Sequence, residues 1–336
     1  MKKLPLLLCL GLDSSEKKRM KARLGRDVIF FWEDEGLSDQ HPVLPKVSFI
    51  SVFIYTHITE QILQKAKKLK LIVTRSTGYD HIDIASCKKQ GISVCNVPFY
   101  GENTVAEHTF ALILALSRNI HRAYVRTISG NFALEGLQGF DLKGKTIGVV
   151  GAGHIGLHVI KMAKGFGMRI LTTDIHQNKF LEEVLGFEYT SLERLLTESD
   201  IISLHAPYSP KTHHLINKEN IQRFKKGALL INTARGGLVE TNALTWALDH
   251  GILGGAGLDV LEEEELIHQE EQFLRKDFPV EKLKTVLENH ILLHRENVVI
   301  TPHIAFNSRE ALERILNTTI DNIRAFMEGH PRNVVI

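Results

Sequence analysis

Cysteine is scarce in this sequence, and the few that occur are not arranged in pairs. Only three are present among 336 residues, at Cys9, Cys87 and Cys95, and none forms a Cys-x-x-Cys motif. A disulfide framework needs an even set of cysteines, and a cysteine zinc site needs closely spaced ones. We therefore expect neither, and we expect the protein to work in a reducing compartment, the cytoplasm.

A long apolar run is also missing. No stretch approaches the roughly 20 residues that a helix needs to cross a bilayer. Lys2, Lys3 and the apolar run at 4–12 imitate a short signal peptide, but no Ala-x-Ala cleavage site follows them. We interpret this segment as a first β-strand that leads into a helix near Asp13, and we expect no membrane partner.

Charge of one sign is not in excess. Lys and Arg number 41 against 39 Asp and Glu, which gives a net charge of +2. Nucleic acids and anionic membranes normally bind surfaces with a strong basic excess, so we expect no nucleic-acid partner. The 17 histidines show no His-Glu-x-x-His or other compact ligand spacing, and we expect no metal.

The composition and the pattern of the chain indicate an α/β fold. Apolar residues make up 43% and charged residues 24%, which is typical of a globular protein, and the length suits two domains. Short β-type runs alternate with amphipathic helical segments along the chain. This alternation favours two doubly wound parallel-sheet domains, of the Rossmann or flavodoxin type.

Two series of strands are expected. The first is Leu4–Leu10, Val47–Tyr55, Leu71–Arg75 and Ser93–Val97, and the second is Thr146–Val150, Met168–Thr173, Ile201–His205, Ala228–Thr233, Gly255–Val260 and Val298–Thr301. A long helix should begin near Thr104, where Thr104–Glu107 fits a capping box, and should bury a face that reaches Ile120. A final helix should run from Ser308 to Gly329.

The second series carries a glycine motif that is typical of dinucleotide binding. Gly151, Gly153 and Gly156, with His154 and Ile155 between them, follow the strand Thr146–Val150 and open a helical segment. The first glycine permits the turn, the second allows backbone to approach a pyrophosphate, and the third allows helix and strand to pack closely. Asp174 ends the next strand, where its carboxylate can bind ribose hydroxyls and repel a 2′-phosphate. The motif therefore predicts NAD rather than NADP.

Polar residues recur where the later strands end, and ligands of open α/β sheets bind beyond those ends. His205, Arg235, Asp259 and His303 each lie there, beside the nucleotide turn. We assign the following strand-end residues to the cofactor: His205, Ala206, Pro207, Thr233, Ala234 and Asp259.

Three of the remaining groups suit hydride transfer to a carbonyl acid. Arg235 offers a planar, fixed positive charge for a carboxylate. His303 could supply the proton, because imidazole is the side chain suited to acid/base catalysis near neutral pH. One member of Glu262–Glu265 could orient that imidazole and favour its charged form, while the others form a solvated acidic loop.

These residues resemble a known family, the NAD-dependent D-isomer-specific 2-hydroxyacid dehydrogenases, with the D-lactate dehydrogenase branch most similar. The resemblance covers essentially the whole chain, in the order and spacing of the family. Its motifs are Gly151–Gly156, Asn232–Gly237, Gly257–Val260 with the acidic residues after it, and Thr301–Ala305.

The resemblance implies a role for each of several side chains. Arg235 would bind the substrate, His303 would be the acid/base, and Glu264, five residues beyond Asp259, would be its partner, although the glutamate run leaves that register open by one residue. The loop at 75–80 would hold the substrate carboxylate. The expected substrate-binding residues are Thr77, Gly78, Tyr100, Phe53 and Phe306, of which Phe53 lies where that branch commonly carries Tyr.

The resemblance also implies an arrangement of domains and an activity. A cofactor domain at 105–300 would be inserted into a substrate domain of 1–104 plus 301–336, with an active-site cleft between them, and the protein would form a homodimer. The expected reaction is NADH-dependent reduction of pyruvate, or a similar small 2-oxo acid, to the D-2-hydroxy acid. Hydroxypyruvate, glyoxylate, 3-phosphoglycerate, bulkier 2-oxo acids and, in another class, an NADH-sensing corepressor remain as alternatives.

Overall fold

The computed structural model describes residues 4–34, 36–264 and 279–336. It divides into two compact units, one of Met1–Tyr100 with Ser308–Ile336 and the other of Gly101–Asn307. The boundaries between the two units, at 100/101 and 307/308, differ by a few residues from the expected domain boundaries at 104/105 and 300/301. Helix α4, Glu102–Ser117, packs on the second sheet, and the turn after β12 is hydrogen-bonded to Asp259, so both belong to the second unit.

A five-stranded parallel sheet forms the centre of the first unit. Its strands lie in the order β2-β1-β3-β4-β5. They comprise β1 (Leu6–Leu10), β2 (Ile29–Glu33), β3 (Phe49–Val52), β4 (Leu71–Thr74) and β5 (Ser93–Cys95). Four of these were predicted, whereas β2 was missed. Residues 29–32 are apolar without interruption although Ile29 and Phe31 are exposed at the sheet edge, so the alternation of apolar and polar residues that marks a strand is lacking.

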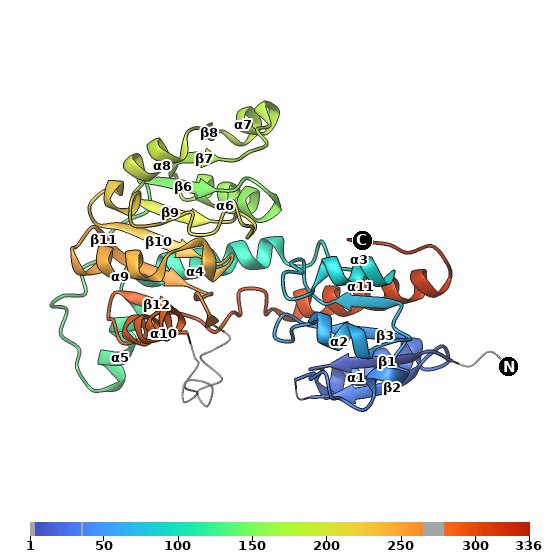
Figure 1. Cartoon of the computed structure of the whole chain (residues 1–336). Helices are drawn as coiled ribbons and strands as arrows, with labels where there is room; N and C mark the ends of the chain where they lie inside the picture. Colours follow the sequence, from blue (N-terminus) through green and yellow to red (C-terminus); the bar gives the residue numbers. More distant parts are fainter. Residues whose placement is uncertain (1–3, 35, 265–278) are drawn as a thin grey trace. The chain divides into compact units, whose positions relative to one another are not determined.

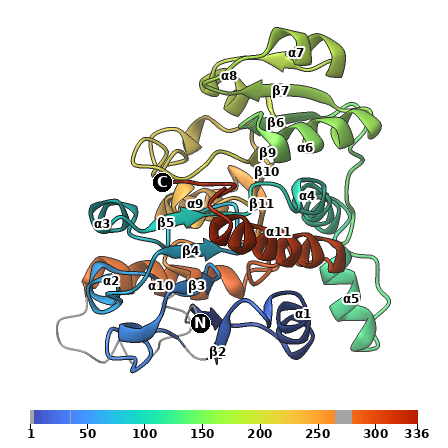
Figure 2. The same cartoon turned by 90° about the vertical axis from the view of Figure 1, so that its right-hand side faces the viewer.

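Helices cover both faces of this sheet (Figures 1 and 2). On one face, α1 (Ser14–Leu24) and α11 (Arg309–Met327) bury Met20, Leu316 and Ile320 against the strands. On the other face lie the 3-10 helix η1 (Leu44–Lys46), α2 (Glu60–Lys65) and α3 (Ile84–Gln90). The predicted cap of α11 is confirmed, because the Ser308 side chain accepts from the N–H of Ala311.

A seven-stranded parallel sheet forms the second unit, in the order β12-β11-β10-β9-β6-β7-β8 (Figure 1). Its strands are β6 (Thr146–Val150), β7 (Arg169–Thr173), β8 (Glu188–Tyr189), β9 (Ile201–Leu204), β10 (Ala228–Asn232), β11 (Leu253–Leu258) and β12 (Val298–Ile300). The chain order reverses between β6 and β9, which is the switch point where doubly wound sheets bind ligands. All but the two-residue β8 were predicted.

The helices of the second unit pack on both faces of its sheet. Helices α4 and α6 (His154–Gly165) cover one face, and α8 (Leu192–Glu198), α9 (Thr241–Asp249) and α10 (Val280–Leu293) cover the other. Helices α5 (Ile120–Ile128) and α7 (Lys179–Leu185) and the 3-10 helices η2 (Ile221–Arg223) and η3 (Gly236–Leu238) complete it.

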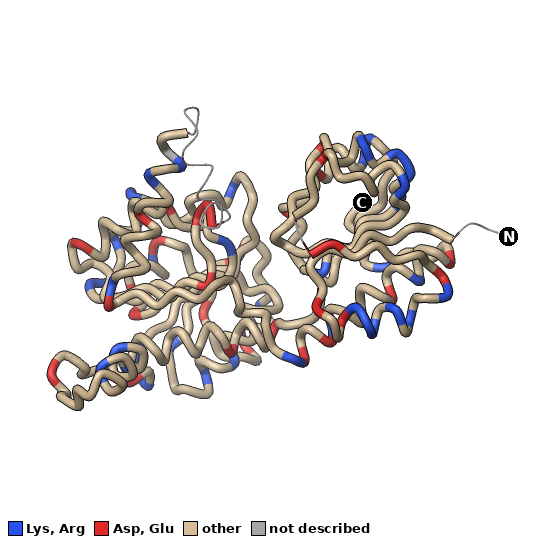
Figure 3. Tube along the Cα trace, turned by 90° about the horizontal axis from the view of Figure 1, so that it is seen from below, with Lys and Arg blue, Asp and Glu red and all other residues tan. Residues whose placement is uncertain are grey.

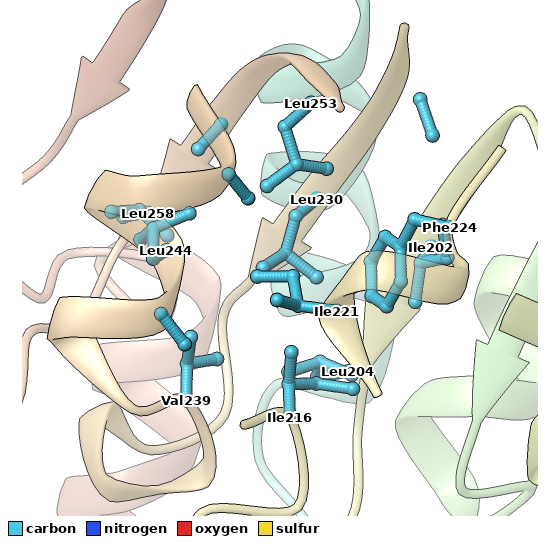
Figure 4. Packing of buried hydrophobic residues seen from close by; sticks show 14 of the residues in the cluster. Ile202, Leu204, Ile216, Ile221, Phe224, Leu230, Val239, Leu244, Leu253 and Leu258 are labelled. Carbon is cyan, nitrogen blue, oxygen red and sulfur yellow. The ribbon is translucent and has the colours of Figure 1, made fainter. Parts of the chain in front are cut away.

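The core on one face of this sheet is a layer of mostly aliphatic side chains (Figure 4). Leu230 of β10 is fully buried and pairs with Ile202 of β9 and Ala256 of β11, and Leu244 of α9 belongs to the same cluster. Burying one such side chain contributes about 1.5–3 kcal/mol. The layer thus fixes the strands whose carboxyl ends carry the candidate site.

Two predictions about helix α4 were wrong. The helix begins at Glu102 after Gly101, so Thr104 is not its cap but lies buried within the first turn. It ends at Ser117, since Asn119 adopts a left-handed conformation with φ of 52°. Ile120 therefore begins α5 and is 55% exposed rather than part of the buried face.

Charged residues of both signs occur in both units. Figure 3 shows Lys and Arg as well as Asp and Glu along the trace of each one. Among the described residues, no helix combines the length and the apolarity needed to span a bilayer, and no group of three or more His, Cys, Asp or Glu could hold a metal ion.

Candidate active site

The polar strand ends identified in the sequence follow neighbouring strands of one sheet. Along its carboxyl edge the order is His303 after β12, Asp259 after β11, Arg235 after β10 and His205 after β9. The glycine turn after β6 and Asp174 after β7 continue the same edge. One half of the edge therefore carries the two histidines, Asp259 and Arg235, and the other half carries the nucleotide-type turn and Asp174.

The three glycines of the turn after β6 meet different surroundings. Gly151 has φ of 97°, and a Cβ there would lie 2.8 Å from the backbone of His205. A Cβ on Gly156 would lie 1.9 Å from the carbonyl oxygen of Gly151, whereas one on Gly153 would meet nothing within 4 Å. Gly151 and Gly156 are thus required by the fold, and the open backbone at Gly153 fits the close approach of a pyrophosphate.

Asp174 is held beside that turn by two backbone donors. Its Oδ2 accepts from the N–H of Ala152 at 2.6 Å and its Oδ1 accepts from the N–H of His176 at 2.7 Å. The half-buried carboxylate is therefore oriented before any ligand binds. Of the other residues in the motif, His154 is exposed and Ile155 is half-buried.

His205 lies at the switch point and carries no charge in the working pH range. Its backbone N–H donates to the carbonyl of Val150 at 2.7 Å, and its Nε2 lies 2.7 Å from the hydroxyl of Ser203. Burial lowers the pKa of His205 to about 3. Ala206 and Pro207 follow it with growing exposure.

His303 and Glu264 form a direct pair. The Nδ1 of His303 lies 2.7 Å from Oε1 of Glu264, and Oε2 of Glu264 accepts from the N–H of Leu261 at 3.1 Å. A carboxylate can only accept, so Nδ1 carries a proton and Nε2 is the nitrogen left to face a substrate. Both carboxylate oxygens are occupied, which fixes the glutamate in position.

The backbone at His303 adopts a left-handed conformation that is unusual for a side chain of this size. Its φ is 53°, and its N–H donates to the carbonyl of Asp259 at 2.9 Å. Such conformations cost about 1–3 kcal/mol and persist only where the surroundings impose them. They are concentrated at functional sites, where they aim a side chain.

Asp259 imposes this conformation on the turn. Its buried carboxylate accepts from the hydroxyl of Thr301 at 2.5 Å and from the N–H groups of Ile304 and Ala305 at 2.9 and 2.8 Å. Burial alone would raise the pKa of Asp259, but bonds from His108, Thr301 and these backbone groups outweigh it and lower the pKa. The sequence assigned Asp259 to the cofactor, whereas its carboxylate contacts the turn that bears His303.

Arg235 follows β10 in a turn shaped by a buried amide. The Asn232 side chain donates to the carbonyl of Arg235 at 2.9 Å and accepts from the N–H of Ala234 at 3.1 Å. A Cβ on Gly236 would lie 2.0 Å from the carbonyl oxygen of Leu261. The backbone after Arg235 therefore packs directly on the backbone that leads to Glu264, and this contact needs glycine. Thr233 is buried, with its hydroxyl 3.0 Å from that of Thr109.

The other members of the glutamate run have different partners. Glu262 Oε1 lies 2.6 Å from Nε2 of His214, and its Oε2 accepts from the hydroxyl of Thr241 at 2.8 Å. Glu263 pairs with Lys282 at 2.9 Å, and Glu265 lies outside the described residues. Of the three described glutamates, Glu264 is the one that contacts His303.

The loop expected to hold a carboxylate belongs to the first unit. Thr77 is exposed and Gly78 is half-buried, after β4. Among the residues that the structure describes, none accepts a hydrogen bond from the backbone N–H of Thr77 or Gly78. Neighbouring free N–H groups at the carboxyl end of a strand are suited to an anion.

The aromatic candidates lie in both units. Phe53 and Tyr100 are half-buried in the first unit, and Phe306 is half-buried in the second, two residues after Ile304. The Phe53 ring packs edge-on against Tyr55 with 5.5 Å between centroids, and the guanidinium of Arg75 lies 5.8 Å from the Phe53 centroid.

Arg75 itself is a structural residue. Its guanidinium is buried and donates to the carbonyls of Leu10 and Gly11 at 2.6 and 2.9 Å and to the hydroxyl of Ser51 at 3.2 Å. A phosphorylated substrate would need free cations near the loop at 76–78. Arg75 is not available for that purpose.

Sequence reasoning missed His108, which supports the site from α4. Its Nε2 lies 3.0 Å from the Thr301 hydroxyl and 3.5 Å from Asp259 Oδ1. Its position on the helix falls between Val105 and Leu112, on the apolar face. A polar residue on a buried helical face was therefore the signal that could have found it.

Comparisons with known proteins agree with this geometry. The family model for the NAD-binding domain of D-isomer specific 2-hydroxyacid dehydrogenases matches residues 110–305. The D-lactate dehydrogenase of Escherichia coli is 38% identical over 285 residues, 83% of each chain. A glyoxylate reductase of Korarchaeum cryptofilum is 37% identical over 312 residues, 90% of this chain and 88% of that one. The structure of D-lactate dehydrogenase from Aquifex aeolicus with NAD and lactic acid is 40% identical, with a TM-score of 0.87 and 96% of each chain covered.

Proposed function

The chain belongs to the D-isomer-specific 2-hydroxyacid dehydrogenase family and uses NAD, and from this premise we propose that it reduces pyruvate, or a similar small 2-oxo acid, to the D-2-hydroxy acid. The reverse oxidation uses the same groups. The observation that carries the proposal is the His303–Glu264 pair, 2.7 Å apart, on the sheet edge that also bears Arg235 and the glycine turn.

Each residue has a defined task in this mechanism. Bound NADH supplies the hydride. The guanidinium of Arg235 binds the carboxylate and polarises the carbonyl, and the N–H groups of Thr77 and Gly78 bind the carboxylate. His303 gives the proton on Nε2 to the carbonyl oxygen as negative charge develops there, and Glu264 stabilises the charged imidazole that precedes this transfer. In the reverse direction the neutral imidazole accepts the proton.

The small size of the substrate is supported by the aromatic side chains. Phe53, Tyr100 and Phe306 are the wall residues that we propose, and bulky rings leave room for a methyl group rather than a long side chain. Glyoxylate and hydroxypyruvate are the second choice, because a relative of similar identity is named a glyoxylate reductase. A phosphorylated acid is disfavoured by the engagement of Arg75.

The substrate is identified by following NADH oxidation at 340 nm with pyruvate, glyoxylate, hydroxypyruvate, 2-oxobutyrate, phenylpyruvate and oxaloacetate. We expect the highest kcat/KM with pyruvate. A higher value with phenylpyruvate would keep the mechanism and overturn the proposed aromatic wall. Binding of NADH without turnover of any acid would instead favour the NADH-sensing alternative.

Asp174 determines the preference between NADH and NADPH. The Asp174→Ala variant should bind NADH more weakly and should raise the ratio of kcat/KM for NADPH to that for NADH by about tenfold or more, since like charges at close range cost several kcal/mol. Asp174→Asn removes the charge and keeps one acceptor oxygen, which can serve the N–H of Ala152 or that of His176, so it should show the change in preference with less loss of affinity than Asp174→Ala. An unaltered ratio in both variants would remove Asp174 from the ribose site.

The enzyme is proposed to act as a homodimer, because α5 presents an apolar face. Ile120, Tyr124, Val125 and Ile128 are each more than half exposed, and no residue of this helix is buried. Apolar surface of this kind marks an interface. Light scattering should give about twice the mass of one chain, and the double variant Val125→Glu/Ile128→Glu should give one chain. A wild-type mass of one chain at micromolar concentration would contradict the proposal.

A reducing compartment, the cytoplasm, is proposed from the state of the cysteines. Cys9, Cys87 and Cys95 are buried free thiols. Burial raises the pKa of Cys9 to about 12 and those of Cys87 and Cys95 to about 11, so all three stay protonated. Protonated, buried thiols are poor nucleophiles, and we give them no part in the reaction.

A further inference from the structure

Three asparagine side chains connect distant parts of the first unit to the loop at 76–78. Asn96, which follows β5, donates from Nδ2 to the carbonyl of Thr77 at 2.8 Å. The carbonyl of Asn96 accepts from Nδ2 of Asn322 on α11 at 2.8 Å, and Oδ1 of Asn322 accepts from Nδ2 of Asn333 at 2.9 Å. A continuous line of amides thus runs from the segment after α11 to the loop, and we call Asn96, Asn322 and Asn333 the amide relay.

Asn322 is the central member of the relay and the least replaceable. Its side chain is 1% exposed, and it both donates and accepts. Only an amide offers a donor and an acceptor on one planar group without a charge. Any apolar substitute would leave the Asn96 carbonyl and the Asn333 amide without their partner.

The outer end of the relay is anchored by backbone pairing. The N–H of Asn96 donates to the carbonyl of Asn333 at 3.1 Å, and the N–H of Val335 donates to the carbonyl of Val94 at 2.7 Å. The segment 333–336 therefore lies as an added edge beside β5. Asn333 has φ of 51°, a left-handed conformation that asparagine tolerates.

The loop is held from its other side by a separate set of bonds. The Ser76 hydroxyl donates to the carbonyl of Gly78 at 2.6 Å and lies 2.6 Å from the hydroxyl of Thr74, which in turn lies 3.0 Å from Nε2 of buried His81. The hydroxyl of Thr77 donates to the carbonyl of Val97 at 3.0 Å. The carbonyls and hydroxyls of the loop are thus engaged, whereas the N–H groups of Thr77 and Gly78 have no acceptor among the described residues.

We propose that the amide relay positions the carboxylate-binding loop. Asn322 is the positioning residue, because it connects α11 to Asn96, whose side chain in turn holds the carbonyl of Thr77. This inference rests on the proposed function, in which the N–H groups of Thr77 and Gly78 bind the substrate carboxylate. Because those contacts are made equally in the ground state and the transition state, loss of the relay weakens substrate binding and leaves the chemical step almost unchanged.

The test is the Asn322→Leu variant, assayed with pyruvate and NADH. We expect KM for pyruvate to rise roughly tenfold, the effect of losing about one well-placed hydrogen bond to a charged group, with kcat within about twofold. Oxamate is an analogue of pyruvate that carries the carboxylate but is not reduced. Its Kd for the NADH complex of the variant should exceed its Kd for the NADH complex of the wild type by the same factor. The Kd of NADH alone, from its fluorescence, should not change, since the cofactor residues belong to the second unit.

Two further variants separate positioning from general damage. Asn333→Gly keeps the left-handed backbone and removes only the outer amide, so it should raise KM in the same direction by a smaller factor. Asn317→Leu, on the same helix, removes an amide whose Oδ1 accepts from Nη1 of Arg23 at 2.9 Å and which has no bond to the loop. It should leave KM unchanged.

The outcomes distinguish the relay from the proposed function. If wild-type protein reduces no 2-oxo acid, the proposed function fails before any variant is made. If wild-type protein is active and Asn322→Leu keeps its KM and its affinity for oxamate, the relay is wrong. An equal rise of KM in Asn317→Leu, or a parallel loss of NADH affinity, would also overturn it. Should Asn322→Leu not fold, an unchanged KM in Asn333→Gly contradicts the inference.

Discussion

The His303→Gln variant should lose between about 10²- and 10⁴-fold in kcat for reduction of pyruvate, the usual contribution of a positioned general acid. Glutamine has a similar length and can still hydrogen-bond to Glu264, but its amide cannot donate a proton to an alkoxide. The Kd of NADH should change little, because the glycine turn and Asp174 follow other strands of the sheet.

The measurement combines single-turnover kinetics with an NADH fluorescence titration. His294→Gln is the matched control, since His294 follows the last residue of α10 and its Nδ1 lies 2.8 Å from the carbonyl of His290 on the same helix. The control should keep wild-type turnover. If His303→Gln retained half of the wild-type kcat, another group would have to supply the proton.

Arg235→Lys should lower kcat/KM for pyruvate by roughly 10- to 100-fold, although the charge is kept. A guanidinium binds a carboxylate through two parallel N–H donors, whereas an ammonium offers a point charge on a flexible stem. Losing a charge-assisted hydrogen bond typically costs about 1.5–3 kcal/mol. The backbone of the turn that carries Arg235 is fixed by Asn232 and by the packing of Gly236, so the backbone cannot shift to compensate for the different side chain.

The kcat/KM of Arg235→Lys is measured by steady-state kinetics, and a substitution of a surface arginine serves as the control. Arg194→Lys alters an exposed arginine that pairs with Glu188 and Glu198, and it should leave kcat/KM unchanged because exposed pairs contribute little. Equal kcat/KM in wild type and Arg235→Lys would contradict the assignment of the substrate carboxylate to this residue.

Local patterns were sufficient for the parts of the site that depend on neighbours in sequence. The glycine spacing after Thr146–Val150 predicted both the turn and the sheet edge, because the roles of the three glycines are set by the strand before them and the helix after them. Strand ends could be placed together because parallel strands share one carboxyl edge. The residues alone left the partner of His303 open among Glu262–Glu265, and the family resemblance left it open by one position. Among the described glutamates, Glu264 is the one that contacts His303.

Features that depend on tertiary pairing were not predictable from one sequence. The contact of Asp259 with the turn at 301–305 and the amide relay join residues between 11 and 226 positions apart. Helical spacing places Asn322, unlike Asn317, on the apolar face of α11 with Ile315, but it does not identify the partners of its amide. The capping box at Thr104 failed for a related reason, since packing of α4 on the sheet extends the helix past a favourable local start.

The proposed reaction is the transfer of hydride from NADH to the carbonyl carbon of pyruvate, on the face that gives the D product, with protonation of the carbonyl oxygen by His303. It is tested most directly by incubating purified wild-type protein with NADH and pyruvate, following absorbance at 340 nm, and resolving the product on a chiral column. We predict consumption of one NADH for each lactate formed, with D-lactate as the product. Formation of L-lactate, or no oxidation of NADH with any 2-oxo acid, would contradict the account.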